Sequence, residues 1–227
     1  MITPAARHDL YVYFHKALRA YMGHVLMDIG RTDWRDAEDR SQQLEAVREL
    51  LLVCRNHIAQ QNRYIHPAME ARQPGSTRLA ADEHTGQLFA IDALALLADL
   101  VERVPAPERS QAGQRLYREL AVFVADCFEH MAVEESEHNE VLWAHYSDAE
   151  LRAIEREMVS EAPAGQTPVL LDWMLPHLNP AERADMLGDM RQVAPNDVFE
   201  RVMGRLRGQL PSKDWGKLTT ALGAVTG

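Results

Sequence analysis

The sequence predicts an all-α protein, with four long helices in an up-down-up-down bundle followed by a smaller helical region. Apolar residues recur at helical spacing over four long segments, whereas the strict alternation typical of strands is almost absent. The connections between the four segments are short, which favours antiparallel neighbours. We expect the bundle to occupy residues 1–160 and the smaller region to occupy residues 161–227.

The ends of the long helices are marked by turn and breaker residues. Gly30 follows the first apolar segment and stands where a C-terminal cap would lie. Pro67 lies inside the second segment, lacks a backbone donor and is expected to bend that helix. The four long helices are expected at about residues 6–29, 41–72, 77–104 and 108–146.

The remainder of the chain has shorter helical segments. The sequence Ser-Asp-Ala-Glu at residues 147–150 has the pattern of a capping box that opens a helix. A linker is expected at residues 160–166, and beyond it Asn179 caps a helix that begins with Pro180. The short helices are expected at about residues 167–177, 180–192, 196–208 and 212–224.

Composition limits the classes of function. Hydrophobic residues make up 46% of the 227 residues, which is enough for a sizeable core. The formal net charge of −10 disfavours nucleic acid and anionic membranes as partners. We recognise no signal peptide and no apolar run near the length of about 20 residues that a membrane span needs. Cys54 and Cys127 fall on apolar helix faces, so we expect buried free thiols in a cytoplasmic protein.

Each of the four long helices carries a histidine on its apolar face. A single histidine in such a place is usually a core residue with a carbonyl partner. Four imidazoles and a carboxylate would be costly, because an unsatisfied buried polar group costs about 1–3 kcal/mol. A metal ion satisfies them together, and imidazole with carboxylate is a usual ligand set for iron, zinc or manganese. The predicted metal-site residues are His15, His57, Gln61, His84, His130 and Glu134.

Two pairs of these residues have the spacing of one helical turn. His57 and Gln61 project to one side of the second helix, and His130 and Glu134 do the same on the fourth. Other histidines are weaker candidates. His66 lies beside Pro67 near the end of a helix and is expected at the surface, and His138 is expected to lie near the ligands rather than among them.

Four segments of the chain carry a resemblance to a known family. They read "FHKALRAYM", "HIAQQNRYIHPAMEARQPG", "LAADEHTGQL" and "FEHMAVEESE" continuing to "LWAHYSDAEL". In order and spacing they resemble the bacterial hemerythrin-like, or HHE cation-binding, domain family over about residues 8–155. The segment from residue 167 onward is similar to a C-terminal extension of some members. The resemblance implies a four-helix bundle with a non-haem di-iron centre, with ligands at His15, His57, His84, His130 and Glu134.

The chain departs from the family pattern at two positions. The family has a glutamate that bridges the two irons where this chain has Gln61. Hemerythrins themselves have a second histidine one turn after the ligand of the third helix, where this chain has Leu88. A neutral amide is a poor bridge between two metal ions because it brings no charge. We therefore expect one ion, or partial occupancy, rather than a tightly bound pair.

These features lead to a metal-binding protein as the first hypothesis. It would hold one or two non-haem irons, with zinc or manganese as alternatives, and would bind or sense dioxygen, nitric oxide or iron. The second hypothesis is a scaffold or protein-interaction bundle whose altered site holds no metal. A metal-dependent oxidoreductase ranks third, because we recognise neither a substrate pocket nor an acid–base pair. The expected partners are a metal ion and a small diatomic ligand, without nucleic acid or membrane, and a homodimer stays open.

Overall fold

The fold of the chain is all-α, as predicted. A computed structural model describes residues 7–161 and 166–223, and no strand occurs in these ranges. The chain divides into two compact units. The first unit contains the described residues up to Val12 and those from Tyr21 to residue 161. The second unit contains Tyr13–Ala20 and the described residues from 166 onward. Helix α1 (Val12–Arg31) is continuous and contributes to both units.

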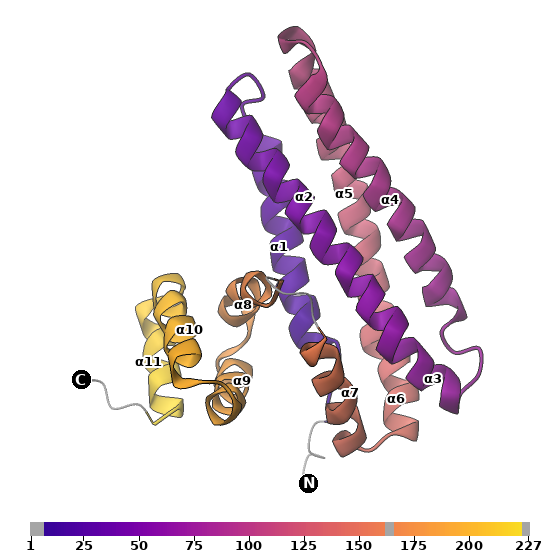
Figure 1. Cartoon of the computed structure of the whole chain (residues 1–227), viewed down its shortest axis with the longest axis vertical. Helices are drawn as coiled ribbons and strands as arrows, with labels where there is room; N and C mark the ends of the chain where they lie inside the picture. The colour runs from indigo at the N-terminus through magenta and orange to yellow at the C-terminus, as the bar shows by residue number, and fades with distance from the viewer. Residues whose placement is uncertain (1–6, 162–165, 224–227) are drawn as a thin grey trace. The chain divides into compact units, whose positions relative to one another are not determined.

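Long helical rods form the first unit (Figure 1). Two of these rods contain a π-helical turn. Helix α4 packs along α5 over the greatest length and against α2, while α3 packs against α6 and α7 against the π-turn η1. The π-turn η1 joins α2 to α3, and the π-turn η3 joins α5 to α6. The bounds are α2 (Ala37–Gln60), η1 (Gln61–Ile65), α3 (His66–Arg72), α4 (Arg78–Arg103), η2 (Ala106–Glu108), α5 (Arg109–Val133), η3 (Glu134–His138), α6 (Asn139–His145) and α7 (Asp148–Ser160).

Capping side chains explain where the first two helices differ from the sequence prediction. Helix α1 begins later than expected because the Asp9 carboxylate accepts the backbone N–H groups of Tyr11 and Val12. Helix α2 begins earlier than expected because Asp36 caps it, accepting from the two N–H groups that follow its first residue. The predicted capping box at residues 147–150 is confirmed, with Ser147 and Glu150 bonded in both directions.

The prediction that Gly30 caps the first helix is wrong. The helix continues through Gly30 to Arg31, and its C-cap is Thr32. Gly30 instead leaves room for a neighbouring aromatic ring, since an added Cβ would lie 3.1 Å from Cε2 of Tyr117 on α5.

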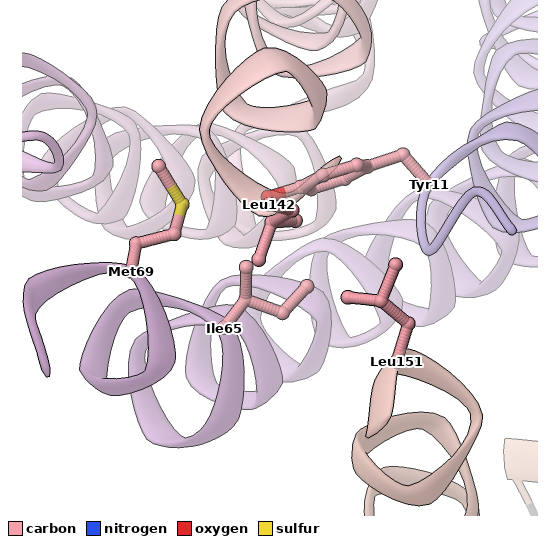
Figure 2. Close-up of a cluster of buried hydrophobic side chains, with 5 residues drawn as sticks. All are labelled: Tyr11, Ile65, Met69, Leu142 and Leu151. Carbon is pink, nitrogen blue, oxygen red and sulfur yellow. The ribbon is translucent and has the colours of Figure 1, made fainter. Parts of the chain in front are cut away.

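A cluster of buried apolar side chains closes the end of the first unit where α3, α6 and α7 meet. Tyr11, Ile65, Met69, Leu142 and Leu151 point toward one another there (Figure 2). Each of them is 1% exposed or less, so the polar residues in the adjoining turns η1 and η3 are shielded from water on this side.

The second unit contains short helices around a leucine-rich core. The buried Arg183 donates hydrogen bonds to the carbonyl groups of Leu175, Pro176 and Leu178, which end α8. Asn179 caps α9 with a capping box to Glu182, as the sequence predicts. The helices are α8 (Gln166–His177), α9 (Pro180–Val193), α10 (Asn196–Gln209) and α11 (Ser212–Ala221), and the core contains Leu175, Leu187, Leu206, Leu210 and Leu218.

Helix α4 is long and apolar enough to cross a membrane by length and composition, and 28% of its most apolar window is buried. The sequence prediction passed over this segment because Asp92 and Asp99 interrupt its apolar residues. A core helix of a soluble protein meets the same criterion. The helix therefore gives only weak support for a membrane location.

Close packing at the start of α5 gives a first testable prediction. A Cβ at Gly113 would lie 2.2 Å from the buried Trp34 ring, so Gly113→Ala must displace that ring. Overpacking of this kind costs about 1–3 kcal/mol, more than the gain of about 1 kcal/mol in helix propensity. We expect Gly113→Ala to lower the free energy of unfolding, measured with urea.

Gly86 in α4 is the matched control for this substitution. It is exposed, and an added Cβ would meet nothing within 4 Å. Gly86→Ala should therefore raise the free energy of unfolding by about 0.5–1 kcal/mol. Equal effects of the two substitutions would show that the contact with Trp34 does not restrict the packing of α5.

Candidate metal centre

Two π-helical turns lie where the predicted site residues occur. Gln61 is the first residue of η1, and Glu134 is the first residue of η3. A π-turn adds one residue to a helical turn, and such turns are frequent at functional sites. They change the helical phase of the residues that follow, so side chains five positions apart come to the same side.

Pro67 accounts for the π-turn η1, which joins α2 to α3. Because proline has no N–H, the carbonyl of Arg63 lacks its usual partner, and the N–H of His66 bonds back to the carbonyl of Gln61, five residues earlier. The bend expected at Pro67 therefore takes the form of a π-turn. The prediction that His66 lies at the surface is wrong, since the changed phase leaves its side chain only 7% exposed.

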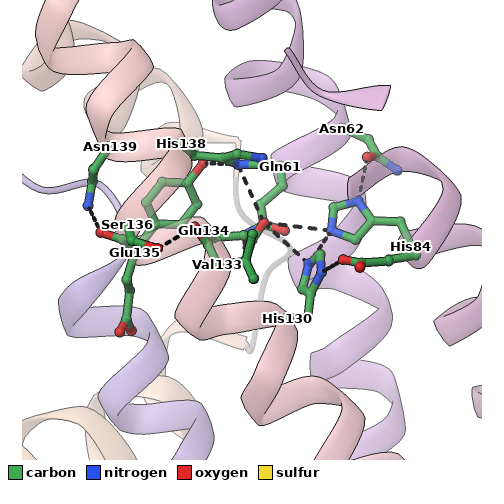
Figure 3. Close-up of polar contacts among 12 residues, drawn as sticks. Gln61, Asn62, His84, His130, Val133, Glu134, Glu135, Ser136, His138 and Asn139 are labelled. Carbon is green, nitrogen blue, oxygen red and sulfur yellow. Dashed lines mark hydrogen bonds and ion pairs between the residues drawn. The ribbon is translucent and has the colours of Figure 1, made fainter. Parts of the chain in front are cut away.

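The carboxylate of Glu134 lies at the centre of a ring of polar side chains (Figure 3). Its side chain is 0% exposed, and the Gln61 amide donates to Oε2 at 3.0 Å. The other oxygen, Oε1, faces three imidazoles. It lies 3.4 Å from Nε2 of His130, 3.8 Å from Nε2 of His84 and 3.9 Å from Nδ1 of His138. This negative charge is therefore stabilised by neighbouring side chains instead of water.

His84 and His130 are oriented by oxygen acceptors behind their rings. Nδ1 of His84 lies 2.7 Å from Oδ1 of Asn62, and Nδ1 of His130 lies 2.6 Å from Oε2 of Glu83. Since both oxygens are acceptors, each Nδ1 carries the hydrogen and donates it. Each Nε2 then keeps its lone pair for the interior. Histidines that bind metals are commonly oriented in this way, with the other ring nitrogen donating to a carboxylate or carbonyl.

The two interior nitrogens face each other at short range. Nε2 of His84 lies 3.0 Å from Nε2 of His130. Two lone pairs at this distance repel unless a proton or a cation lies between them. Two imidazoles that bound one metal at about 2.1 Å would have their nitrogens about 3.0–3.4 Å apart, for angles between a right angle and a tetrahedral one. The donor set and its spacing therefore suit a metal ion held by His84, His130 and Glu134.

Burial keeps most of these imidazoles neutral. It lowers the pKa of His84 to about 3 and that of His138 to about 4, although the nearby charge of Glu134 acts in the opposite direction. Burial also lowers the pKa of His66. At His130 burial again lowers the pKa, but the hydrogen bonds and charges of Glu134 and Glu83 outweigh it and raise the pKa overall. Neutral imidazole is the form that binds a metal.

Two groups of side chains within the first unit bring potential ligand atoms within 4.8 Å of one another, and Glu134 belongs to both. The groups are His84 with His130 and Glu134, and His66 with His138 and Glu134. All these side chains are buried. The predicted ligand His57 also lies in the first unit, and its side chain is half-buried.

The predicted site residues are thus largely found together. Gln61, His84, His130 and Glu134 meet in the first unit, whereas His15 lies in the segment of α1 grouped with the second. That these residues bind a metal stays a prediction. The buried position of His66 was not predicted. The signal in the sequence was Pro67, whose π-turn places His66 five residues after Gln61 on the same side.

Comparison with known proteins gives limited support for a family. No protein-family model matches the chain, and no solved structure matches it. A protein of Arabidopsis thaliana described as zinc finger protein BRUTUS-like is 24% identical over 197 residues. The match covers 83% of this chain but 15% of that protein, so the chain spans a small part of the relative's length. Identity at this level does not establish a shared family.

The buried imidazoles predict a loss of stability in acid. In the unfolded chain His84 titrates near pH 6.5, whereas in the folded chain its pKa is about 3. Between these values the unfolded state binds more protons, so stability is full above pH 6.5 and falls as the pH decreases. From pH 7.5 to 5 the free energy of unfolding of the metal-free protein should fall by about 2 kcal/mol through His84.

Urea unfolding of the chelator-treated protein at the two pH values measures this effect. His130, whose pKa is raised, acts in the opposite direction, so the comparison is made between variants. His84→Gln should lose about 2 kcal/mol less than the wild type over this range. His145→Gln, at an exposed position of α6, should behave as the wild type does. An identical pH dependence in all three proteins would contradict a neutral buried His84.

Proposed function

We propose that this chain is a hemerythrin-like metal-binding protein. In this proposal residues 1–160 form an up-down-up-down four-helix bundle that holds one non-haem iron ion in its core. The observation that carries the proposal is the 3.0 Å approach of Nε2 of His84 to Nε2 of His130 beside the buried carboxylate of Glu134. The packing of the rods α2, α4 and α5 and the resemblance to the hemerythrin-like family support the same conclusion.

The side chains have separate roles in this site. His84 and His130 supply neutral nitrogen donors, and Glu134 supplies the negative charge. Gln61 donates its amide hydrogen to Oε2 of Glu134, which directs Oε1 toward the imidazoles. The Oε1 atom of Gln61 is buried without a hydrogen-bond partner among the described residues, so it is available as a further weak ligand. The family resemblance adds His15 and His57 as further ligands.

Charge favours one ion over two. Glu134 is the one carboxylate among the residues of the candidate site that is fully buried, and Gln61 is neutral. One divalent ion beside it leaves about one uncompensated positive charge, whereas two ions would leave about three in a low-dielectric core. When bound, iron would supply binding of a small diatomic ligand such as dioxygen or nitric oxide, because His84, His130 and Glu134 would occupy only some of its coordination positions.

The cellular setting belongs to the same proposal. Cys54 and Cys127 are free and buried, as predicted. Free thiols suit a reducing compartment, and the formal net charge of −10 disfavours nucleic acid as a partner. We therefore propose the cytoplasm as the location. Zinc or manganese would suit the same donors, so the metal must be identified by measurement.

Metal content per chain tests the proposed number of ions. After anaerobic reconstitution with ferrous iron and removal of excess metal, the wild type should retain about one ion. Gln61→Glu adds a second carboxylate and should raise the content toward two ions, because it offsets one of the uncompensated charges. Gln42→Glu, an exposed change of the same kind on α2, should leave the content unchanged. Two tightly held irons in the wild type would contradict the charge argument, and no metal in any of the proteins would favour the scaffold hypothesis.

The carboxylate behind His130 provides an independent test of the same site. Glu83→Gln removes the charge that holds Nδ1–H of His130 and lowers the basicity of Nε2. Metal affinity, measured by competition with a chelator, should fall about 10- to 100-fold. Glu129→Gln makes the same charge change at the exposed residue before His130 and should have little effect. Equal losses in both variants would show that only net charge matters.

A further inference from the structure

We propose that His66, His138 and Glu134 form a second metal position, which shares Glu134 with the position at His84 and His130 and competes with it for one ion. This inference rests on the proposed function, because it assumes that the Glu134 carboxylate receives a cation. It adds two ligands, His66 and His138, that lie outside the ligand set implied by the family resemblance.

His66 is a buried base whose interior nitrogen has no partner. Its Nε2 atom makes no hydrogen bond with any described residue, although the side chain is buried. A buried nitrogen without a partner costs about 1–3 kcal/mol, so a satisfied core histidine does not account for it. A lone pair beside a buried carboxylate is, however, well placed for a cation.

His138 is held from one side by a phenol. Its Nδ1 atom lies 3.0 Å from the hydroxyl oxygen of Tyr11 and 3.9 Å from Oε1 of Glu134. Both side chains are buried, so this hydrogen bond fixes the ring without help from water. In the tautomer with the hydrogen on Nδ1, that hydrogen is donated to Tyr11, and Nε2 rather than the Nδ1 atom that faces Glu134 is the nitrogen that would bind a cation. The ring of His138 stands edge-on to that of His66, with centroids 5.8 Å apart at 82°.

The two positions adjoin each other. The ring of His66 stacks on that of His84, with centroids 5.0 Å apart and planes 3° from parallel. Oε1 of Glu134 is the carboxylate atom nearest to His84, to His130 and to His138. One oxygen thus serves both positions, and two divalent ions around it would leave the same excess of about three positive charges. The positions are therefore alternatives for one ion.

The donor chemistry defines the ligand class. Two imidazoles and one carboxylate suit Zn²⁺, Fe²⁺ or Co²⁺, and three protein ligands leave at least one further coordination place open. Helices α3 and η3 carry the second position, whereas α4 and α5 carry the first. Movement of the ion between them would transfer its charge from α4 to α3, beside the rod of α5 and η3 that both positions share.

Cobalt binding to a variant with one complete group of ligands tests this position. His57→Ala with His84→Ala removes one ligand that the family resemblance implies and one histidine of the group around His130, and leaves His66, His138 and Glu134 intact. This double variant should still bind about one Co²⁺ per chain, with visible d–d absorption. Adding His66→Ala or His138→Ala should weaken binding at least about tenfold, because losing a ligand costs no less than losing the hydrogen-bond partner of a ligand. Adding His145→Ala, at an exposed position, should leave it unchanged.

The outcomes separate the two proposals. No Co²⁺ bound by the wild type would overturn the proposed function itself. If the wild type binds Co²⁺ and the double variant does not, only the second position is overturned. The same holds if the double variant binds Co²⁺ with an affinity that neither His66→Ala nor His138→Ala changes. Circular dichroism checks that each variant is folded. If the double variant is unfolded, Zn²⁺ is titrated into the wild type and the imidazole ¹⁵N resonances are recorded. Shifts of the ring-nitrogen resonances of His66 and His138 would support the second position. Unchanged resonances of both residues would overturn it.

Discussion

The buried charge of Glu134 is the constraint on which the arrangement of the site depends. A carboxylate removed from water must be stabilised by hydrogen bonds and opposite charge, or else it becomes protonated. Gln61 supplies a hydrogen bond to one oxygen, and imidazoles from α4, α5 and η3 surround the other. The histidines are in turn kept neutral by burial, except at His130. The carboxylate and the imidazoles therefore form a set of donors that suits a cation.

The π-turns determine which side chains reach this carboxylate. In an uninterrupted α-helix Gln61 and His66, five residues apart, would point about 140° from each other. The bond from the His66 N–H to the Gln61 carbonyl closes a wider turn and brings both side chains to the interior. Pro67 makes this turn favourable because it cannot donate to the carbonyl of Arg63. A residue that would ordinarily disrupt a helix thus adds a buried imidazole to the site.

The sequence predicted the helical class, the caps at Ser147 and Asn179, and the meeting of Gln61, His84, His130 and Glu134, because all of these follow from α-helical periodicity and local capping. It did not predict His66 as a buried residue, because a regular period of 3.6 residues carries that side chain outward. It also did not predict Glu83 and Asn62 behind the histidines. Their roles depend on how α4 packs against its neighbours, which no local pattern encodes.

The neutral side chain of Gln61 also affects the metal-free protein. Two buried carboxylates would repel each other, so a core with glutamate at both positions would depend on cations for stability. With Gln61 the amide N–H stabilises the charge of Glu134, and the raised pKa of His130 lets a proton supply the opposite charge. The core can therefore remain folded without an ion. A site of this kind suits reversible binding of one cation, since loss of the metal leaves a single negative charge that the protein itself can compensate.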